Sequence, residues 1–294
     1  MSTAVQSHEE PFPLGAQLKG DSGRTYRIEE ILADRRKPLL CVYRALADEG
    51  SYIIKNMIPG EFEYQLDLQK QLASCPNVRA VVDTVPDFDL FIYPFLAGDL
   101  LHIKPNNVLV DYGEDIQGEM IIKNVQISDL EDTVLVPPGK WLRGPLCGNA
   151  IWRSPESWCR SRQNQASDVF SFAIVYPLQM IYVMLNEMVF RVSDYQLHAS
   201  DSWRYVLQRH ISYFADEEGL AGFLKHIGED NPLHGHLMTL ASNFSSGNPR
   251  EPFGSWNYVE PEFRDLVEKM TNLDPARRIT AKQALEHCWF SQAI

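Results

Sequence analysis

Short apolar runs separated by turn residues dominate the first hundred residues of the chain, a pattern typical of β-strands. Four such runs occupy residues 25–32, 39–43, 51–54 and 90–93. Between the third and the fourth, the apolar residues of segment 62–72 recur near the spacing of one helix face, and Ser74–Pro76 ends that helix. The first part of the chain is therefore predicted to form a sheet with one helix.

Helical patterns dominate after residue 169. The candidates for long helices are residues 169–190, 201–215, 259–271 and 281–291. The last of these has a well-specified start, because Thr280 and Gln283 have the spacing of a capping box. A small β-rich part followed by a larger helical part predicts an α+β fold with two lobes.

Composition and charge exclude several classes of function. A chain of 294 residues, 45% apolar and 22% charged, is expected to form one large or two small globular domains. Its formal charge of −12 argues against a surface for nucleic acid or anionic membrane, because both need a positive footprint. We therefore expect neither a nucleic-acid partner nor a membrane partner.

The cysteines and the most apolar segment indicate an intracellular protein. Five scattered cysteines without a Cys-x-x-Cys pair fit a reducing compartment, and the eight histidines show no metal-binding spacing. The window 169–185 contains Pro177 and Gln179 and falls short of the about 20 apolar residues of a membrane span, so it is interpreted as a core helix. We expect a cytoplasmic or nuclear protein with a flexible tail at residues 1–20.

Six short motifs follow one another along the chain. They are Ile54–Lys55, Lys104–Asn107, Asp129–Glu131, Ser154–Glu156, Ser167–Phe172 and Leu273–Arg278. In this order, over residues 25–291, they resemble a eukaryotic protein kinase domain of a divergent, fungal type. The resemblance implies a β-rich N-lobe with its hinge at residues 21–97 and a helical C-lobe at 98–294, in which 190–256 is a divergent helical region.

A kinase domain of this kind would transfer a phosphoryl group from ATP to serine or threonine of a protein substrate, and catalysis would rest on positioning and charge neutralisation. The resemblance implies that Lys55, on a strand ending in YIIK, holds the α- and β-phosphates. Its usual glutamate partner is ambiguous. Gln65 falls near the expected position, and Glu61 or Glu63 lies within one turn of it. Glu63 is taken as the candidate for the nucleotide site.

The resemblance also implies a Mg²⁺ site made by Asn107 and Asp129. Asp129 follows the apolar segment 121–127, which is where the metal-binding aspartate belongs. The residues after it are Leu130 and Glu131 instead of the usual Phe-Gly pair, so the loop lacks the backbone freedom of that glycine.

Two departures from the family weaken the expected catalysis. The segment 31–41, ILADRRKPLLC, contains no glycine through which backbone amide groups approach phosphates closely, and a solvated basic turn is favoured over phosphate contacts by Arg35–Lys37. Alignment on Lys104 places His102 where the catalytic aspartate belongs. His102 and Lys104 are the candidate catalytic residues, but a well-placed base contributes about 10²–10⁴-fold, so this chain is expected to be a poor kinase.

The substitution at His102 coincides with a deletion relative to the family. The segment FIYPFLAGDLL resembles the hinge, and only eight residues separate Phe95 from Lys104. Two helices with their connections, which the family has at this place, need roughly 30 residues. We interpret His102 as the end of the hinge side joined to Ile103 across a deletion. An alternative transcript or an incorrect gene model would give the same sequence.

The residues with a structural role match the family better than those with a chemical one. Glu156 and Arg278 match a buried ion pair, and Asp168 matches the aspartate that braces the catalytic loop. Between Asp132 and Arg153 the hydroxyl side chain is Thr133, so we expect no activation by loop phosphorylation.

Three readings of function remain open from the residues. The first is a serine/threonine kinase-like transferase that binds ATP and Mg²⁺ and has weak or lost activity, since IKPN is nearer the serine/threonine form. The second is a pseudokinase that acts as a binding or scaffold module for a partner protein. The third is an incomplete gene product.

Overall fold

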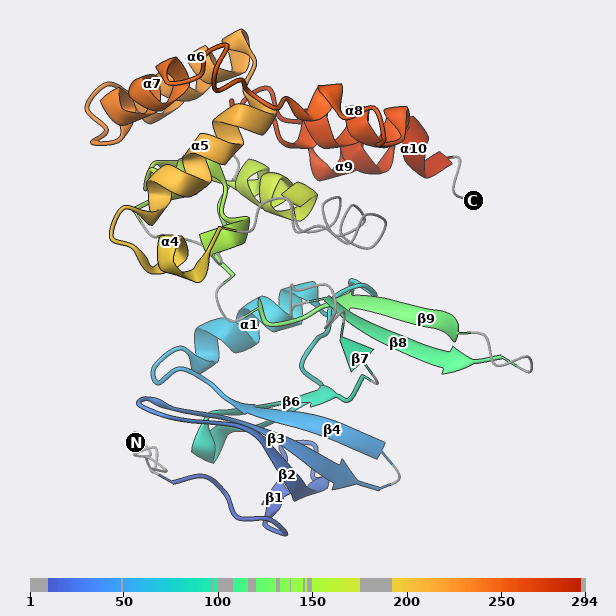
Figure 1. Cartoon of the computed structure of the whole chain (residues 1–294). Coiled ribbons are helices and arrows are strands. Elements are labelled where there is room, and N and C mark those ends of the chain that lie inside the picture. The colour runs from blue at the N-terminus through green and yellow to red at the C-terminus, as the bar shows by residue number, and fades with distance from the viewer. Residues whose placement is uncertain are drawn as a thin grey trace. The chain divides into compact units, whose positions relative to one another are not determined.

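The computed structural model describes residues 10–48, 50–96, 98–99, 108–115, 120–130, 133–137, 139–144, 146, 150–174 and 192–291. The chain forms two compact units, Met1–Val134 and Leu135–Ile294 (Figure 1). The first is built mainly from strands and the second mainly from helices, so the predicted two-lobe α+β fold is confirmed.

A six-stranded antiparallel sheet in the order β1-β2-β3-β4-β6-β5 forms the base of the first unit. Its strands are β1 (Gln17–Lys19), β2 (Thr25–Arg36), β3 (Leu39–Ala47), β4 (Gly50–Asn56), β5 (Asp83–Val85) and β6 (Leu90–Pro94). A short 3-10 helix, η1 (Pro86–Phe88), connects the last two. Buried residues alternate along β3, which marks one buried face of the sheet, whereas the consecutive buried residues of β6 show that both faces are covered at that strand.

The N-terminal segment covers one of these faces. Phe12 is buried, and its ring lies 6.0 Å from that of Tyr43 and 5.1 Å from that of Phe88. The backbone N–H of Phe12 also donates to the Tyr43 hydroxyl at 3.2 Å. Residues 10–20 therefore differ from the flexible tail expected at 1–20, because the outer face of the sheet needs apolar cover and this segment supplies it.

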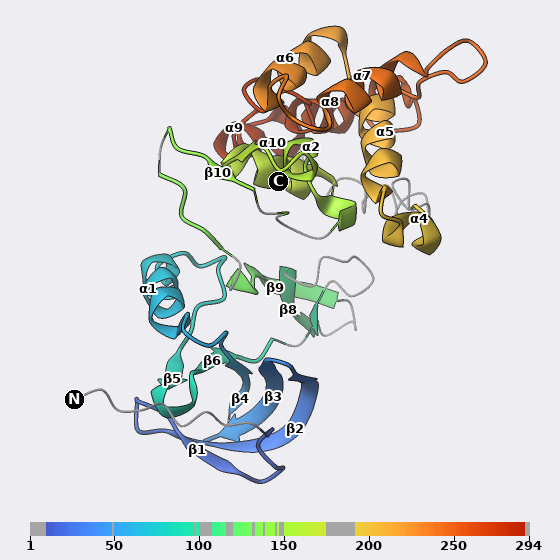
Figure 2. The same ribbon diagram turned by 90° about the vertical axis from the view of Figure 1, so that its left-hand side faces the viewer.

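Helix α1 (Phe62–Leu72) packs on the opposite face (Figure 2). The Phe62 ring lies 5.0 Å from that of Phe91, and Ile53 and Tyr93 belong to the same buried cluster. Lys55 lies two residues after Ile53 on β4, so its side chain leaves the sheet on the side of α1.

A three-stranded sheet completes the first unit. It consists of β7 (Gly98–Asp99), β8 (Val108–Glu114) and β9 (Met120–Ile127) in the order β7-β8-β9. The end of β9 bonds to the segment after α1, since Ile127 N–H donates to the Asn77 carbonyl and Arg79 N–H to the Ile127 carbonyl, both at 2.8 Å. These bonds hold β9 in the first unit, which is why the compact unit runs to Val134 and does not stop at residue 97.

The pairing of β7 with β8 bears on the deletion inferred from the sequence. Gly98 pairs with Val110 and Asp99 with Leu109, so two neighbouring antiparallel strands follow the hinge segment directly. Eight residues, 100–107, connect them. That length is far below the roughly 30 residues that two helices with their connections need.

The second unit contains most of the helices. Its described elements are β10 (Leu142–Arg143), η3 (Ala150–Trp152), α2 (Pro155–Trp158), β11 (Arg162–Gln163), a helix at 165–174, α4 (Asp194–His198), α5 (Ser202–Phe214), α6 (Glu217–Ile227), α7 (His234–Ser242), η4 (Phe253–Ser255), α8 (Pro261–Met270), α9 (Ala281–Leu285) and α10 (Cys288–Ser291). Helix α5 lies beside α4 and α7 (Figure 1). The helices around 201–215 and 259–271 agree with the sequence pattern.

Two predicted helices differ in extent. The one expected at 169–190 begins at residue 165, and its part beyond 174 lies outside the described residues. The one expected at 281–291 is divided into α9 and α10. Its start is as predicted, because Thr280 and Gln283 form a capping box. None of the described helices has both the length and the apolar character that crossing a bilayer requires.

Candidate functional site

An ion pair joins Lys55 on β4 to Asp129, two residues after β9. The Lys55 amine donates to Asp129 Oδ1 at 2.7 Å, and it lies 5.9 Å from the centre of the Tyr93 ring. The Lys55 side chain is 19% exposed and that of Asp129 51% exposed. The structure thus brings two of the residues predicted for nucleotide and metal together, with solvent access at the carboxylate.

The backbone of Asp129 adopts an unusual conformation. Its φ of +63° lies in the left-handed region, which side chains other than glycine seldom adopt and which costs on the order of 1–3 kcal/mol. The neighbouring Leu130 is buried, and the Lys55 amine holds the carboxylate itself. The burial of Leu130 and the hydrogen bond from Lys55 together fix the conformation of this loop. Such support is typical of strained residues at functional sites.

Glu63, the candidate partner of Lys55, lies on the exposed side of helix α1. Residues Phe62, Gln65, Leu68 and Gln69 form the buried face of α1, whereas Glu63 lies on its exposed side. Helix periodicity explains this, since Glu63 is rotated by about 100° from Phe62. Burial raises the pKa of Asp89, and the negative charge of Glu63 acts in the same direction. An amide, Gln65, occupies the buried position.

The turn between β2 and β3 is the glycine-free segment identified in the sequence. Arg36 donates to both carboxylate oxygens of Asp34, at 2.6 and 2.9 Å, and also binds Glu10. These hydrogen bonds lower the pKa of Asp34. The guanidinium of Arg36 is therefore neutralised by carboxylates of its own unit, which leaves it a weak candidate for a phosphate contact.

Sequence reasoning missed Arg79. This buried residue donates from Nε to the Pro94 carbonyl at 3.0 Å, and its guanidinium lies 5.2 Å from the centre of the Tyr93 ring. Gln69 donates to the Tyr93 hydroxyl at 3.1 Å. Together these contacts tie the hinge strand to α1 and to the segment after it. No sequence pattern indicated that Arg79 is buried, because a single arginine after a helix end is ordinarily expected to be solvated.

The remaining candidates for chemistry, His102, Lys104 and Asn107, lie outside the described residues. Strand β8 starts immediately after them at Val108. In the part of the chain that the structure describes, no group of three or more His, Cys, Asp or Glu side chains is arranged to hold a metal ion. A Mg²⁺ ion at Asp129 would therefore need ligands from Asn107 or from nucleotide phosphates.

In the second unit, Glu156 and Arg278 form the expected buried ion pair. The guanidinium donates to Glu156 Oε1 at 2.8 Å and Oε2 at 3.2 Å, and neither side chain has exposed surface. Ser167 donates to Oε1 at 2.7 Å. Burial alone would raise the pKa of Glu156, but the charge of Arg278 and these hydrogen bonds outweigh it and hold the pKa below its ordinary value.

Asp168 lies three residues into the helix at 165–174. Desolvation of its carboxyl group raises its pKa and the charge of Glu156 acts in the same direction, although the residue as a whole is exposed. The loop that it is expected to brace contains residues 102–107, which are outside the described part. Its bracing role stays a prediction.

Comparison with known proteins places these features in context. The family model "Protein kinase domain" matches residues 100–290. A crystal structure of a kinase domain superposes on 95% of this chain and 98% of its own length, with a TM-score of 0.61 and 13% sequence identity. That likeness concerns the fold.

Curated relatives match over short segments. The chain is 43% identical over 53 residues to ribosomal protein S6 kinase alpha-1 of Rattus norvegicus, which is 18% of this chain and 7% of that protein. It is 50% identical over 40 residues to calcium/calmodulin-dependent protein kinase type II subunit delta of Oryctolagus cuniculus, which is 14% of this chain and 8% of that protein. The matched segments thus span less than a tenth of these relatives.

Proposed function

Because the chain belongs to the protein kinase domain family, we propose that it binds ATP with Mg²⁺ through Lys55 and Asp129, and that its phosphoryl transfer to protein serine or threonine is weak or lost. The observation that carries this proposal is the 2.7 Å contact between the Lys55 amine and Asp129 Oδ1. An ammonium group beside a carboxylate supports the proposal, because phosphates need the first kind of group and a metal ion the second.

The chemistry of the two groups fits the ligand. A lysine ammonium is a compact charge suited to phosphate oxygens, and a carboxylate is an oxygen ligand of the kind that Mg²⁺ prefers. Mg²⁺ supplies charge neutralisation of the phosphates when it is bound. On arrival of nucleotide, Lys55 would exchange the Asp129 oxygen for a phosphate oxygen, and Asp129 would turn to the cation.

Two features of the first unit support weak binding. The β2–β3 turn lacks glycine, and Arg36 there is engaged by Asp34 and Glu10. Helix α1 presents Gln65 at its buried position, where a carboxylate would bind and orient the lysine. Nucleotide affinity then rests on Lys55 and the metal, without a backbone cradle.

A second candidate function, a pseudokinase that acts as a scaffold, is favoured by the contrast between the two units. The Glu156–Arg278 pair of the second unit is complete and fully buried. The catalytic aspartate and the two helices before it have no counterpart in the sequence. A partner protein would in that case be the ligand of the chain, in place of a phosphorylated substrate.

The test is a thermal-shift titration of the full chain with ATP, with and without Mg²⁺. A ligand specific for the native state adds about 2.7 kcal/mol at a hundred times its Kd. We expect a Mg²⁺-dependent rise in Tm that Lys55→Met and Asp129→Asn abolish. Lys19→Met, on the exposed strand β1, is the matched control and should leave the rise unchanged.

Transfer of ³²P from ATP to a generic basic protein separates the two candidates. Binding with transfer far below that of an intact kinase supports the first, and a cooperative melting transition unmoved by nucleotide supports the scaffold. The lack of any cooperative transition would point to an incomplete gene product. Coding sequence for a His-x-Asp motif between the codons for His102 and Ile103 would support that reading as well.

The proposed location is the cytoplasm or the nucleus. The described cysteines, Cys41, Cys75, Cys159 and Cys288, are free thiols. Free thiols are the usual state in a reducing compartment. Microscopy of a tagged chain tests this.

A further inference from the structure

Strand β10 pairs with β11 in a short antiparallel ribbon of the second unit, and this ribbon is basic (Figure 2). Arg143 on β10 lies directly opposite Arg162 on β11. Residues directly opposite each other in an antiparallel pair share one face of the sheet, and like charges in that position repel. The ribbon therefore places two guanidinium groups on one face, where an anion between them would offset their repulsion.

A third guanidinium group reaches the same end of the ribbon. Arg160 Nη1 donates to the carbonyl of Gly144, the residue that follows Arg143, at 3.2 Å. The backbone of Arg160 has a φ of +49°, in the left-handed region that an arginine seldom adopts. The hydrogen bond to Gly144 carries the Arg160 side chain across to the strand of Arg143. Three arginines thus meet where the two strands end.

Contacts with helix α6 hold Arg162 in place. Its Nη2 donates to the His226 carbonyl at 2.7 Å, and His226 Nε2 donates to the Arg162 carbonyl at 2.8 Å. The Arg162 guanidinium also lies 5.7 Å from the centre of the Trp141 ring, which is 5.2 Å from the His226 ring. The described hydrogen bonds use one of the five N–H donors of this guanidinium. Because the group is already ordered, it loses little entropy when it binds a ligand.

The three arginines have no acidic partner among the described residues. None of them forms an ion pair there, although the whole chain carries a formal charge of −12. The acidic residue of segment 139–163 is Glu156, which is buried and bound to Arg278. Glu229 and Asp230, which follow α6, form no described ion pair with the arginines either. The ribbon is thus an uncompensated positive patch on an acidic protein.

Three guanidinium groups favour a phosphate over a carboxylate. A phosphorylated serine or threonine carries a charge of about −1.5 to −2 at pH 7 and three acceptor oxygens. A carboxylate carries a single charge and has fewer oxygens. Guanidinium forks bind phosphate oxygens through pairs of parallel hydrogen bonds, which a lysine does not form. The number and the kind of cations at the ribbon therefore fit a phosphate group.

The surroundings of the patch favour a phosphate on a protein segment. A nucleic acid is a polyanion that the acidic remainder of the chain would repel, whereas a single phosphate needs the local patch alone. Trp141, beside Arg162, is 38% exposed. Its ring offers apolar contact area to a residue that flanks the phosphate in a peptide, and free phosphate cannot use that area.

We propose that Arg143, Arg160 and Arg162 bind the phosphate of a phosphorylated serine or threonine in a partner protein, and that a flanking apolar residue of this partner packs on Trp141. The site goes beyond the proposed nucleotide function, since all of its residues lie in the second unit. It serves a kinase that recruits a phosphorylated substrate and a scaffold that recruits a phosphorylated partner.

The probe that tests the proposal is the peptide N-acetyl-Ala-Leu-phosphoserine-Leu-Ala-amide, which has leucine on both sides of the phosphate. Its Kd for the full chain is measured by isothermal titration calorimetry at low ionic strength, because salt screens exposed charges. Comparison probes are the unphosphorylated peptide, the peptide with glutamate for phosphoserine, and inorganic phosphate. The protein variants are Arg143→Gln, Arg160→Gln and, as matched control, Arg204→Gln on α5, where the arginine is 49% exposed.

We expect the phosphopeptide to bind more tightly than all three comparison probes. Arg143→Gln and Arg160→Gln should each raise its Kd about tenfold, because each removes a charge-assisted hydrogen bond, while Arg204→Gln leaves the Kd unchanged. Arg143 makes no described side-chain hydrogen bond, so its replacement should leave the fold intact, and Trp fluorescence melts check this for every variant.

Four results would each overturn the proposal. The first is absence of phosphopeptide binding at about 10 mM, beyond the millimolar range of weak recognition. The second is an unchanged Kd in folded Arg143→Gln. The third is equally tight binding of the glutamate or the unphosphorylated peptide. The fourth is equally tight binding of inorganic phosphate, which would assign the patch to a free anion and remove the role of the partner segment.

Discussion

The amine of Lys55 and the carboxylate of Asp129, 74 residues apart in the chain, are hydrogen-bonded at 2.7 Å. The lysine comes from the central sheet and the aspartate from the loop after the β8–β9 hairpin, so this one contact joins two sheets of the first unit. Because α1 presents an amide at its buried position, the metal-binding candidate also serves as the described ion-pair partner of the lysine. Nucleotide and Mg²⁺ must therefore compete with this internal contact.

Restoring a carboxylate on α1 should relieve that competition. Gln65 is buried on the face of α1 that packs toward the side of the sheet carrying Lys55. In Gln65→Glu a buried carboxylate of nearly the same size needs a cation. Lys55 and Arg79 both lie near Tyr93 on that side, and the Arg79 guanidinium is already engaged by the Pro94 carbonyl. We expect the ATP-induced rise in Tm to become larger and more dependent on Mg²⁺, since Asp129 is then released to the metal.

Glu63→Gln is the control for this experiment, because Glu63 lies on the exposed side of α1. It should leave both the size and the Mg²⁺ dependence of the rise unchanged. If Gln65→Glu and Glu63→Gln behave alike, the view that Lys55 restrains Asp129 is wrong.

The buried pair in the second unit gives a stability prediction. Neither side chain of the pair is exposed, so Arg278→Met leaves the Glu156 carboxylate buried without a partner. Removal of one partner of such a pair costs about 3–5 kcal/mol of the free energy of unfolding. All six tryptophans lie in the second unit, so a urea titration followed by Trp fluorescence reports this loss directly. The Glu156→Met/Arg278→Met double variant should be more stable than Arg278→Met, because it buries no unpaired charge.

The adjacent arginine is a matched control. Arg277 binds Glu218 at the surface, where the two side chains are 44% and 77% exposed. Arg277→Met should therefore change the free energy of unfolding by about 1 kcal/mol or less. If Arg277→Met and Arg278→Met lower the free energy of unfolding by similar amounts, the structural role does not belong to the buried Glu156–Arg278 pair alone.

The sequence was most informative where a local motif determines the contact. The Thr280–Gln283 capping box and the Glu156–Arg278 pair both follow from short motifs with one dominant geometry. Motif order singled out Lys55 and Asp129, and the structure places these two side chains in contact. The partner on α1 stayed ambiguous in the sequence, because choosing between Glu63 and Gln65 needs the rotation of the helix, which a shift of one residue changes by about 100°.

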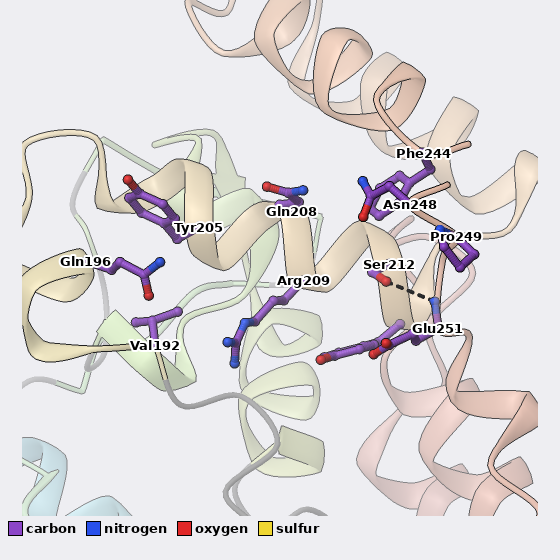
Figure 3. Close-up of a pocket in the computed structure, with 11 residues that line it drawn as sticks. Val192, Gln196, Tyr205, Gln208, Arg209, Ser212, Phe244, Asn248, Pro249 and Glu251 are labelled. Carbon is purple, nitrogen blue, oxygen red and sulfur yellow. Dashed lines mark hydrogen bonds between the residues drawn. The ribbon is translucent and has the colours of Figure 1, made fainter. Parts of the chain in front are cut away.

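Contacts between distant segments were not predictable from pattern. Arg79 reaches the Pro94 carbonyl, and Phe12 covers strands that begin far along the chain, yet neither residue belongs to a periodic run. A groove along α5, lined among others by Gln208, Arg209 and Glu251 (Figure 3), is a similar case. Its residues alternate with the apolar face of the helix in a regular way, but the opposing wall comes from a loop whose path is set by tertiary hydrogen bonds.

Phe12 offers a test of the N-terminal segment. Its ring is buried between Tyr43 and Phe88, so Phe12→Ala should cost about 3–5 kcal/mol in the unfolding of the first unit. Leu14→Ala, two residues away and 64% exposed, should change stability by less than about 0.5 kcal/mol. Hydrogen exchange of β3 amides is the measurement, because the first unit contains no tryptophan. Equal protection in the two variants would show that residues 10–20 are the loose tail that the sequence suggested.

His210 makes the second unit sensitive to mild acid. Burial lowers the pKa of His210 to about 3, the charge of Arg278 acts in the same direction, and Glu156 opposes both. Its ring packs 5.1 Å from that of Phe170 and 6.4 Å from that of Phe214, and its buried Nδ1 has no hydrogen-bond partner among the described residues. The unfolded chain takes up a proton near the ordinary pKa of about 6.5, and the folded chain does not.

The stability that the neutral imidazole contributes is therefore complete above pH 6.5 and is lost as the pH falls toward 3. Each pH unit in that window removes about 1.4 kcal/mol per histidine, and His226, whose pKa burial also lowers, adds to the effect. Glu156 acts only at lower pH, because its pKa lies below the ordinary carboxyl value. Urea titrations followed by Trp fluorescence at pH 7 and pH 5 should show a loss of about 2 kcal/mol or more, reduced in His210→Leu and retained in the exposed-site control His198→Asn. A pH dependence that survives His210→Leu unchanged would assign the acid sensitivity to other groups.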